Sequence, residues 1–186
     1  MRTFIAVEVP GSVRAQVGGY VDTLRPKFDN SVKWVHKDNL HFTVKFLGDV
    51  ADDDLDAIRG CVGRTASDFS SFSLGIGGIG FFPSERNPRV FWLGADGGGE
   101  RLLEIFQDLE SCLEEEGFFR DAKPFSPHLT IGRVRRNRRV AVPERLDDFE
   151  YVSFTVDGLA IVKSTLTPKG PVYETLHESR FPVRSF

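Results

Sequence analysis

The chain has 186 residues, of which 40% are hydrophobic, so it is long and apolar enough to bury a sizeable core. Its 24 Lys and Arg against 27 Asp and Glu give a formal net charge of −3, which excludes binding of polyanions through overall positive charge and leaves only a local basic patch. No apolar run is long enough for a membrane span or a signal peptide, so we expect a cytoplasmic protein.

The first third of the chain predicts two strand–helix alternations. Residues 2–9 alternate and are rich in β-branched side chains, which predicts a strand. Residues 10–28 begin with turn residues and then show helical spacing of the apolar positions Val13, Val17, Tyr20, Val21 and Leu24. Residues 32–35 and 40–48 read as strands, and residues 49–66 open with acidic side chains and continue with a helical period.

The middle of the chain predicts a hairpin, a helix and a further strand. Residues 72–82 and 89–95 have strand composition and are joined by a turn containing Pro and Asn. Residues 97–117 have the clearest helical period, and Gly117 ends it. The expected apolar stripe of this helix consists of Leu102, Leu103, Phe106, Leu109 and Leu113. Residues 128–134 read as a strand.

The last part of the chain predicts strands again. Residues 139–149 fit either a short helix or a loop, whereas residues 151–166 and 172–183 read as strands separated by a turn at 167–170. Short turns between successive strands favour an antiparallel α+β fold over a parallel sheet. No segment resembles a linker, so residues 1–186 are expected to form a single domain of two lobes.

The pattern His-apolar-Thr-apolar occurs twice, as "HFTV" at residues 41–44 and "HLTI" at 128–131. Residues two apart on a strand share a face, so His41, Thr43 and Lys45 should point one way. The second motif pairs its imidazole and hydroxyl in the same manner. One histidine on a strand is more often structural than catalytic, but packing rarely asks for the same polar pair twice. The repetition therefore predicts a site that needs two acid–base groups.

Two imidazoles and two hydroxyls suit the in-line cleavage of a phosphodiester. With an ordinary pKa of about 6.5, one imidazole can be neutral and accept a proton while the other is protonated and donates one. The hydroxyls of Thr43 and Thr130 can donate to phosphate oxygens. No HExxH or CxxC pattern is present, and His36 and His177 lack neighbouring ligand types, so neither a metal nor a cofactor is expected.

Three other features have simpler interpretations. The "GIGGIG" stretch at 75–80 satisfies GxGxxG, but Pro83 follows where a dinucleotide site needs a helix, so these glycines are expected to permit bulges or close strand packing. The arginine-rich run at 133–139 fits a solvated loop and an RNA-backbone contact equally well. Cys61 and Cys112 are expected to be two buried free thiols.

These motifs and their flanks resemble the two-histidine (2H) phosphoesterases, specifically the RNA 2′,3′-cyclic phosphodiesterases, also called 2′-5′ RNA ligases. The resembling segments are "MRTFIAVEVP", "VKWVHKDNLHFTVKFLGDV", "RVFWLG", "FSPHLTIGRV" and "VKSTLTPKGPVYETL". The resemblance implies a bilobal α+β fold with pseudo-two-fold symmetry, in which two antiparallel sheets face a central groove and helices pack outside. It also implies hydrolysis of RNA 2′,3′-cyclic phosphate ends to 2′-phosphomonoesters without a metal.

The resemblance further implies individual roles. His41 would protonate the leaving 3′ oxygen, and His128 would activate water; locally the two motifs are equivalent, so this assignment rests on the family alone. Thr43 and Thr130 would hold the phosphate. Arg133 would contact phosphate or base.

The resemblance also covers two aromatic residues, and the sequence differs from the usual family pattern at two positions. Phe4 and Tyr173 would pack against a base. The chain has Val44 and Ile131 where the family often has leucine, which conserves volume.

The expected partners are RNA with 2′,3′-cyclic phosphate ends, such as tRNA fragments, or cyclic nucleotides, bound by a monomer with no membrane contact. Two alternatives stay open. The same groove could join tRNA halves by 2′-5′ ligation, or the chain could bind RNA ends through its arginines without catalysis.

Overall fold

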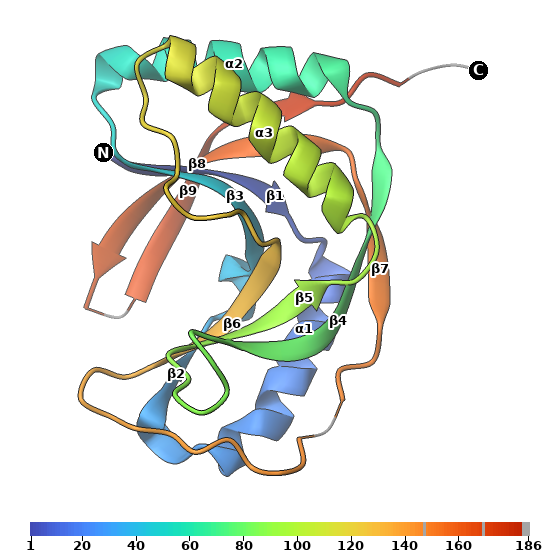
Figure 1. Ribbon diagram of the computed structural model, residues 1–186, viewed down its shortest axis with the longest axis vertical. Helices are drawn as coiled ribbons and strands as arrows, with labels where there is room; N and C mark the ends of the chain where they lie inside the picture. The colour runs from blue at the N-terminus through green and yellow to red at the C-terminus, as the bar shows by residue number, and fades with distance from the viewer. Residues whose placement is uncertain (147, 169, 184–186) are drawn as a thin grey trace.

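The computed structural model describes residues 1–146, 148–168 and 170–183, and its centre is a curled antiparallel sheet (Figure 1). The strand order is β7-β4-β5-β6-β3-β1-β8-β9, and β2 pairs separately with β6. The strands are β1 (Arg2–Glu8), β2 (Val32–Trp34), β3 (His41–Asp49), β4 (Phe72–Phe82), β5 (Val90–Ala95), β6 (His128–Val134), β7 (Val152–Val156), β8 (Gly158–Thr167) and β9 (Gly170–Arg180). The expected antiparallel α+β architecture is confirmed.

The sheet consists of two lobes that meet at one place. Strands β1, β3, β8 and β9 form the first lobe, and β2, β4, β5, β6 and β7 form the second. Between the lobes, β3 and β6 share a single register pair, Phe42 opposite Leu129. The two expected sheets are therefore present, and they are joined edge to edge at their central strands.

The α-helices of the described residues cover the sheet on its outer side (Figure 1). They are α1 (Gly11–Leu24), α2 (Leu55–Asp68) and α3 (Gly99–Glu115). Helix α2 contacts β8 and β9, α3 contacts β3 and β4, and α1 contacts β7. The buried side of α1 is the predicted stripe, namely Val13, Val17, Tyr20, Val21 and Leu24. None of the helices in the described part of the chain is long and apolar enough to cross a membrane.

The predicted stripe of α3 needs one correction. Leu103 is 37% exposed, and Ile105 is fully buried in its place. Ile105 follows Leu102 by three positions and precedes Leu109 by four, so it shares their face of the helix. The buried face is therefore turned toward Ile105 and away from Leu103.

The late strands also differ from expectation at one point. The expected strand at 151–166 is divided at Asp157 into β7, which pairs with β4, and β8, which pairs with β1. The chain thus crosses from one lobe to the other there. Residues 139–149 form no helix among those described, Asp147 lying outside them. The β8–β9 hairpin is confirmed, with Lys169 of its turn outside the described residues.

The cysteine expectation was wrong, because Cys61 and Cys112 form a disulfide. Cys61 is on α2 and Cys112 is on α3, and these helices lie side by side (Figure 1). Their Cα atoms are 5.6 Å apart, which suits a disulfide. A separation of 51 residues gave no hint of this contact in the sequence.

The glycine-rich stretch continues as strand β4 instead of opening a helix. The adjacent strand β5 approaches it closely, since a Cβ atom at Gly80 would lie 2.2 Å from the Trp92 ring. The register with β5 shifts between Gly77 and Ile79, where a bulge lies. Both structural expectations for these glycines, close packing and a bulge, are confirmed.

Candidate active site

The two His-Thr motifs begin the two central strands of the sheet. His41 is the first residue of β3, and His128 is the first residue of β6. Because antiparallel neighbours pair i+1 with j−1, the Phe42–Leu129 register sets His41 across from Thr130, and Thr43 across from His128. The four polar side chains therefore share the concave face at the junction of the lobes.

Each of these strands contains a bulge at the last residue of its motif. In β3, the partners of Ala6 and Ile5 are Thr43 and Lys45, so Val44 is skipped. The bulge reverses the alternation, and the prediction that Lys45 shares a face with His41 was wrong. Lys45 is only 2% exposed and faces α3, whereas Phe46 reaches the side of the motif.

Strand β6 repeats this irregularity at the same place. The partners of Trp92 and Phe91 are Thr130 and Gly132, so Ile131 is skipped. Simple alternation from Thr130 would have placed Gly132 on the motif side. The bulge instead brings Arg133 onto this side.

Both imidazoles are fixed through the same atom. His41 Nδ1 lies 2.8 Å from the carbonyl oxygen of Asn39, and His128 Nδ1 lies 2.7 Å from that of Ser126. A carbonyl oxygen only accepts, so each Nδ1 carries the hydrogen and donates it. In the neutral imidazole the lone pair is then on Nε2, which makes Nε2 the atom available for proton transfer in both motifs.

Aromatic side chains hold each ring. The Phe4 ring stacks on His41 with centroids 4.7 Å apart, and Tyr173 meets His41 edge-on at 5.2 Å. On the other side, Phe82 meets His128 edge-on at 5.0 Å. These ring contacts restrict rotation of the imidazoles. The hydrogen bonds from Nδ1 to the backbone carbonyls set the orientation of each ring.

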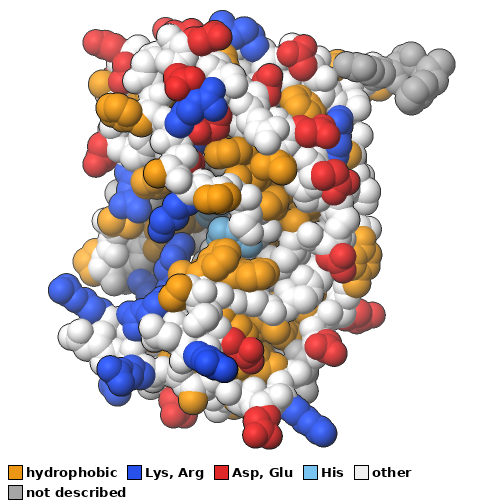
Figure 2. Space-filling view, in the orientation of Figure 1, with side chains coloured by type: hydrophobic (Ala, Val, Ile, Leu, Met, Phe, Trp, Pro, Cys, Tyr) orange, Lys and Arg blue, Asp and Glu red, His pale blue; other side chains and the backbone are white. Residues whose placement is uncertain are grey.

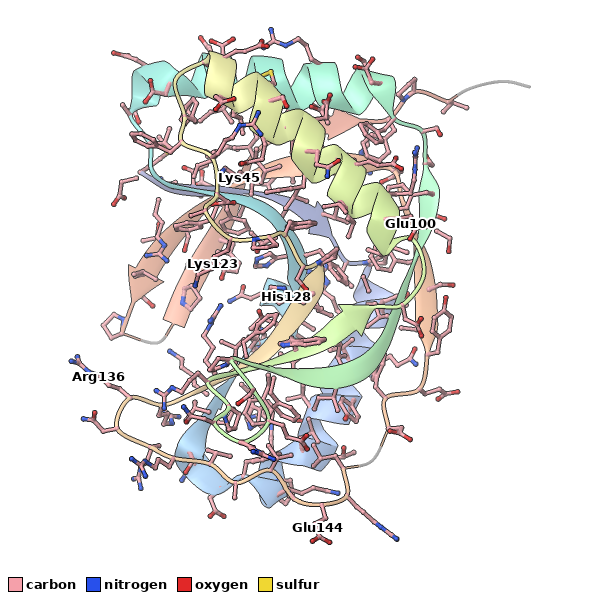
Figure 3. All side chains as sticks on the ribbon, viewed as in Figure 1. Lys45, Glu100, Lys123, His128, Arg136 and Glu144 are labelled. Carbon is pink, nitrogen blue, oxygen red and sulfur yellow. A yellow bond between two sulfur atoms is a disulfide. The ribbon has the colours of Figure 1, made fainter. Side chains whose placement is uncertain are left out.

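A cavity of about 180 Å³ opens between the motifs. All seven residues predicted for the site line it, namely Phe4, His41, Thr43, His128, Thr130, Arg133 and Tyr173. Figure 3 places His128 at the centre of the molecule, and Figure 2 shows Lys and Arg side chains gathered beside a histidine side chain that is visible on this face. The structure therefore brings together two segments that are distant in the sequence.

Sequence reasoning missed five residues of the cavity, namely Arg2, Val35, Asn39, Phe46 and Ser164. Arg2 had a usable signal, because it lies two positions before Phe4 on one strand and so shares its face. Ser164 is the cross-strand partner of Tyr173 and needed the hairpin register to be found. Phe46 was hidden by the bulge.

The pKa values of both histidines are lowered below the ordinary imidazole value. For His41, burial is the main cause, the hydrogen bond to Asn39 raises the pKa in part, and the positive charge of Arg133 lowers it further. For His128, burial again dominates, with Ser126 and Arg133 acting in the same two directions. Burial thus favours the neutral form of both imidazoles.

The pKa of Tyr173 is shifted in the opposite direction, above its ordinary value. Burial raises the pKa of its phenol, although Arg133 and Arg2 oppose the rise. The phenol therefore stays protonated near neutral pH and can donate a hydrogen bond to an oxygen in the cavity.

The arginines of the run 133–139 do not all face the cavity. Arg133 faces the cavity, whereas Arg135 donates from Nε to the carbonyl oxygen of Asn30 at 2.8 Å. Arg136 points away from the molecule in Figure 3, and the side chains that follow it in the run are exposed. Only the first arginine of the run reaches the histidines.

Buried charges fix the segment that leads into the second motif. Lys45 Nζ forms an ion pair with Glu110, which is 4% exposed, and lies 3.4 Å from Asp121. Lys45 also donates to the carbonyl oxygen of Phe119 at 3.0 Å, and the amide of Asp121 donates to Glu110 at 2.9 Å. The first motif strand and α3 thereby hold the irregular segment that precedes His128 (Figure 3).

The described residues contain no group of three or more His, Cys, Asp and Glu side chains arranged to hold a metal ion. The polar side chains that line the cavity include imidazoles, hydroxyls and guanidinium groups.

A sequence model of the 2′-5′ RNA ligase superfamily matches residues 10–167, which include both motifs. The chain belongs to this superfamily. Its relatives include the RNA 2′,3′-cyclic phosphodiesterase of Thermotoga maritima, which is 36% identical over 97% of this chain and 96% of its own length. The protein of the same name from Methanothermobacter thermautotrophicus is also 36% identical, over 97% of this chain and 98% of its own length.

Solved structures agree with this membership of the 2′-5′ RNA ligase superfamily. The crystal structure of TT0787 of Thermus thermophilus superimposes with a TM-score of 0.83 and 32% sequence identity, covering 97% of this chain and 98% of that one. The bilobal fold implied by the resemblance is therefore the fold of the family.

Proposed function

We propose that this enzyme hydrolyses RNA 2′,3′-cyclic phosphate ends to 2′-phosphomonoesters without a metal, using His41 and His128 as its acid and base. The names of the relatives at 36% identity over nearly the full chain support cyclic phosphate hydrolysis. The observation that carries the mechanism is the shared anchoring of the two imidazoles. Both have Nδ1 bound to a backbone carbonyl and line one cavity, so two Nε2 atoms are available to one substrate.

The reaction balances with these two groups. Neutral His128 accepts a proton from water at Nε2 as the water oxygen bonds to phosphorus. The bond from phosphorus to the 3′ oxygen breaks, and protonated His41 gives its Nε2 proton to that oxygen. The products are a 2′-phosphomonoester and a 3′ hydroxyl, and exchange of protons with solvent restores both imidazoles. Because both imidazoles are anchored through Nδ1 in the same way, the order of roles follows the family resemblance.

The remaining polar groups stabilise the charge on phosphate. The hydroxyls of Thr43 and Thr130 lie beside the imidazoles and donate to non-bridging oxygens. Arg133 offers a planar, permanently charged donor group from the same face. Tyr173 lies edge-on to His41 and offers a ring surface to the terminal base. Phe4 stacks on His41 and is 4% exposed, so it would meet the base only through the edge that lines the cavity.

Turnover of 2′,3′-cyclic AMP by purified variants tests the mechanism. We expect His41→Ala and His128→Ala each to lower kcat by orders of magnitude while circular dichroism stays unchanged. His177→Ala is the matched control, because His177 is on β9 outside the cavity lining and bonds to Ser179. Near-normal rates in either motif variant would refute the assignment.

The family description also favours a second candidate, 2′-5′ ligation at the same cavity. Incubation of cleaved tRNA halves with the wild-type protein separates the two activities, since ligation gives a longer RNA and hydrolysis gives only a 2′-phosphate end. A protein that binds such ends without changing them would instead be the non-catalytic binding module.

Four further expectations complete the proposal. The substrates are RNA ends such as those of tRNA fragments, and the protein acts as a monomer in the cytoplasm. Strands β1 to β9 belong to one continuous sheet, which supports a single domain. A disulfide such as Cys61–Cys112 is uncommon in a reducing cytoplasm, which counts against this location.

A further inference from the structure

A second, larger groove of about 670 Å³ continues from the catalytic cavity. Six of its lining residues also line the cavity, namely Arg2, Val35, Asn39, Arg133, Ser164 and Tyr173. The two hollows are therefore one continuous space. Its outer part runs between β2 of the second lobe and the β8–β9 hairpin of the first, which stand apart in Figure 1. The cavity between the motifs is about 180 Å³, and the larger groove that continues from it offers room for further parts of a substrate.

The charge of this groove is uniform although the protein is net negative. Arg2, Lys33 and Arg133 line it, and none of the described carboxylates does. Within the described part of the chain, no Asp or Glu forms an ion pair with any of these three side chains. Cations left unpaired along one groove concentrate phosphate groups there, because no neighbouring carboxylate neutralises them.

The groove also offers flat and apolar surfaces. Trp34 lines it and is held by edge-to-face contacts with Phe91 at 5.4 Å and Phe28 at 6.0 Å. On the opposite wall, Leu166 and Val172 of the hairpin are 67% and 56% exposed. Rigid rings and apolar side chains beside cations are the surfaces on which single-stranded nucleic acids stack their bases.

The chemistry of the substrate fixes the direction of the chain. A 2′,3′-cyclic phosphate uses both O2′ and O3′ of the last nucleoside, so an RNA can continue only through O5′ of that nucleoside. With the cyclic phosphate between the imidazoles, the preceding nucleotides have to leave the cavity through an opening. The opening with positive charge and stacking surface is the groove that shares Arg133 and Tyr173 with the site.

We propose that this groove binds the nucleotides on the 5′ side of the cyclic phosphate, with Lys33 contacting a backbone phosphate and the Trp34 and Val172 walls contacting bases. The inference rests on the proposed function and adds a substrate class, since it makes single-stranded RNA ends of two or more nucleotides better substrates than cyclic mononucleotides. Double-stranded ends fit less well, because their bases are paired and cannot spread onto the walls.

Two substrates and three variants test the proposal. One substrate is 2′,3′-cyclic AMP, the other is a tetranucleotide that ends in a 2′,3′-cyclic phosphate, and their kcat/KM values are compared. The groove variants are Lys33→Glu and Val172→Glu, both at exposed positions of the groove. The matched control is Arg136→Glu, which reverses one positive charge as Lys33→Glu does, but on the exposed loop away from the groove (Figure 3).

We expect wild-type protein to prefer the tetranucleotide by at least about tenfold in kcat/KM. Lys33→Glu should remove most of this preference, leave 2′,3′-cyclic AMP turnover unchanged, and reduce the slope of log kcat/KM against log salt by about 1. Val172→Glu should act in the same direction, and Arg136→Glu should retain the preference. Equal turnover of both substrates by the wild type, or equal losses in Lys33→Glu and Arg136→Glu, would overturn the proposal.

Binding separates failure of the groove from failure of the proposed function. If wild-type protein turns over neither substrate, the hydrolase assignment fails, and the groove is then tested by fluorescence anisotropy with a labelled tetranucleotide ending in a 2′-phosphate. Weaker binding to Lys33→Glu with unchanged binding to Arg136→Glu would still support the groove. Equal binding by both variants would refute it.

Discussion

Val44 and Ile131 occupy the same position in their two motifs, and each is left out of the register with the adjacent strand, β1 for Val44 and β5 for Ile131. The pairing of β1 passes from Thr43 to Lys45, and that of β5 passes from Thr130 to Gly132. Each bulge turns the residue two positions later toward the cavity. The duplicated element is thus a strand with a defined irregularity as well as a short sequence pattern.

The lowered pKa values of the two histidines predict the pH dependence of catalysis. Burial disfavours the charged imidazole, so in the free enzyme both groups lose their protons below the ordinary pKa of about 6.5. Since one imidazole has to be protonated and the other neutral, kcat/KM should follow a bell with its maximum on the acidic side of about 6.5. Measurement with 2′,3′-cyclic AMP checks this, and a maximum above about pH 7 would contradict it.

Removal of Arg133 should move this profile in a known direction. Its positive charge lowers the pKa of both His41 and His128, so Arg133→Ala should shift both limbs to higher pH. The variant should also lower kcat/KM by about 10- to 100-fold, because a charge-assisted hydrogen bond to phosphate is lost. Arg136→Ala, on the exposed loop, is the control and should change neither quantity. A loss of rate without any shift of the limbs would limit Arg133 to substrate binding.

The buried ion pair predicts a large effect on stability. In Lys45→Met, Glu110 would keep a buried charge without its cation, so the free energy of unfolding should fall by about 3–5 kcal/mol in urea titrations. Replacing both residues with apolar ones, as in Lys45→Met with Glu110→Leu, should recover much of that loss. Arg59→Ala breaks an exposed ion pair with Asp56 and should change stability far less. Equal effects of the two single variants would contradict the buried-charge account.

Close packing at Gly80 predicts an effect on the second motif. In Gly80→Ala the new Cβ would overlap the Trp92 ring, which lies 5.1 Å from Phe82 and 6.3 Å from His128 between ring centroids. We expect a loss of about 1–3 kcal/mol in the free energy of unfolding together with a lower kcat. Gly60→Ala is the control, since nothing lies within 4 Å of its added Cβ and it is in a helix, where alanine is favoured. An unchanged kcat in Gly80→Ala would show that Trp92 does not position His128.

The disulfide predicts that the native protein has no reactive thiol at Cys61 or Cys112. Removing it in Cys61→Ser with Cys112→Ser should lower the free energy of unfolding by about 2–4 kcal/mol, because a link across 51 residues no longer restricts the unfolded chain. Turnover of 2′,3′-cyclic AMP should be retained, since neither cysteine lines the cavity. Thiol titration of the untreated native protein checks the premise, and two free thiols would contradict it.

The sequence was sufficient for the features that are local. The spacing of Val13, Val17 and Leu24 predicted the buried side of α1, and the repeated His-Thr pattern identified two segments that the fold brings to one cavity. Such patterns persist because one face of a helix or strand is buried over its whole length.

The sequence was insufficient where a neighbouring strand decides the outcome. Nothing in "TVKF" indicates that β1 skips Val44, so Lys45 was placed on the wrong face. The contact between Cys61 and Cys112 depends on how α2 and α3 pack, and the role of Ser164 depends on the hairpin register. These features depend on which strands and helices pair with each other in the folded protein, and the local sequence carries no signal for that pairing.

The single register pair between the lobes, Phe42 with Leu129, has a consequence for how such proteins diversify. Each half carries its own anchored imidazole and its own bulge. The strand pairing between the halves, here called the seam, is one residue pair long, while α3 and the shared hydrophobic core also connect them. A small rotation at that seam would change the gap between the two Nε2 atoms while leaving each half intact. Substitutions around the seam could therefore adapt the enzyme to larger or smaller phosphoesters while the two histidines keep their roles in proton transfer.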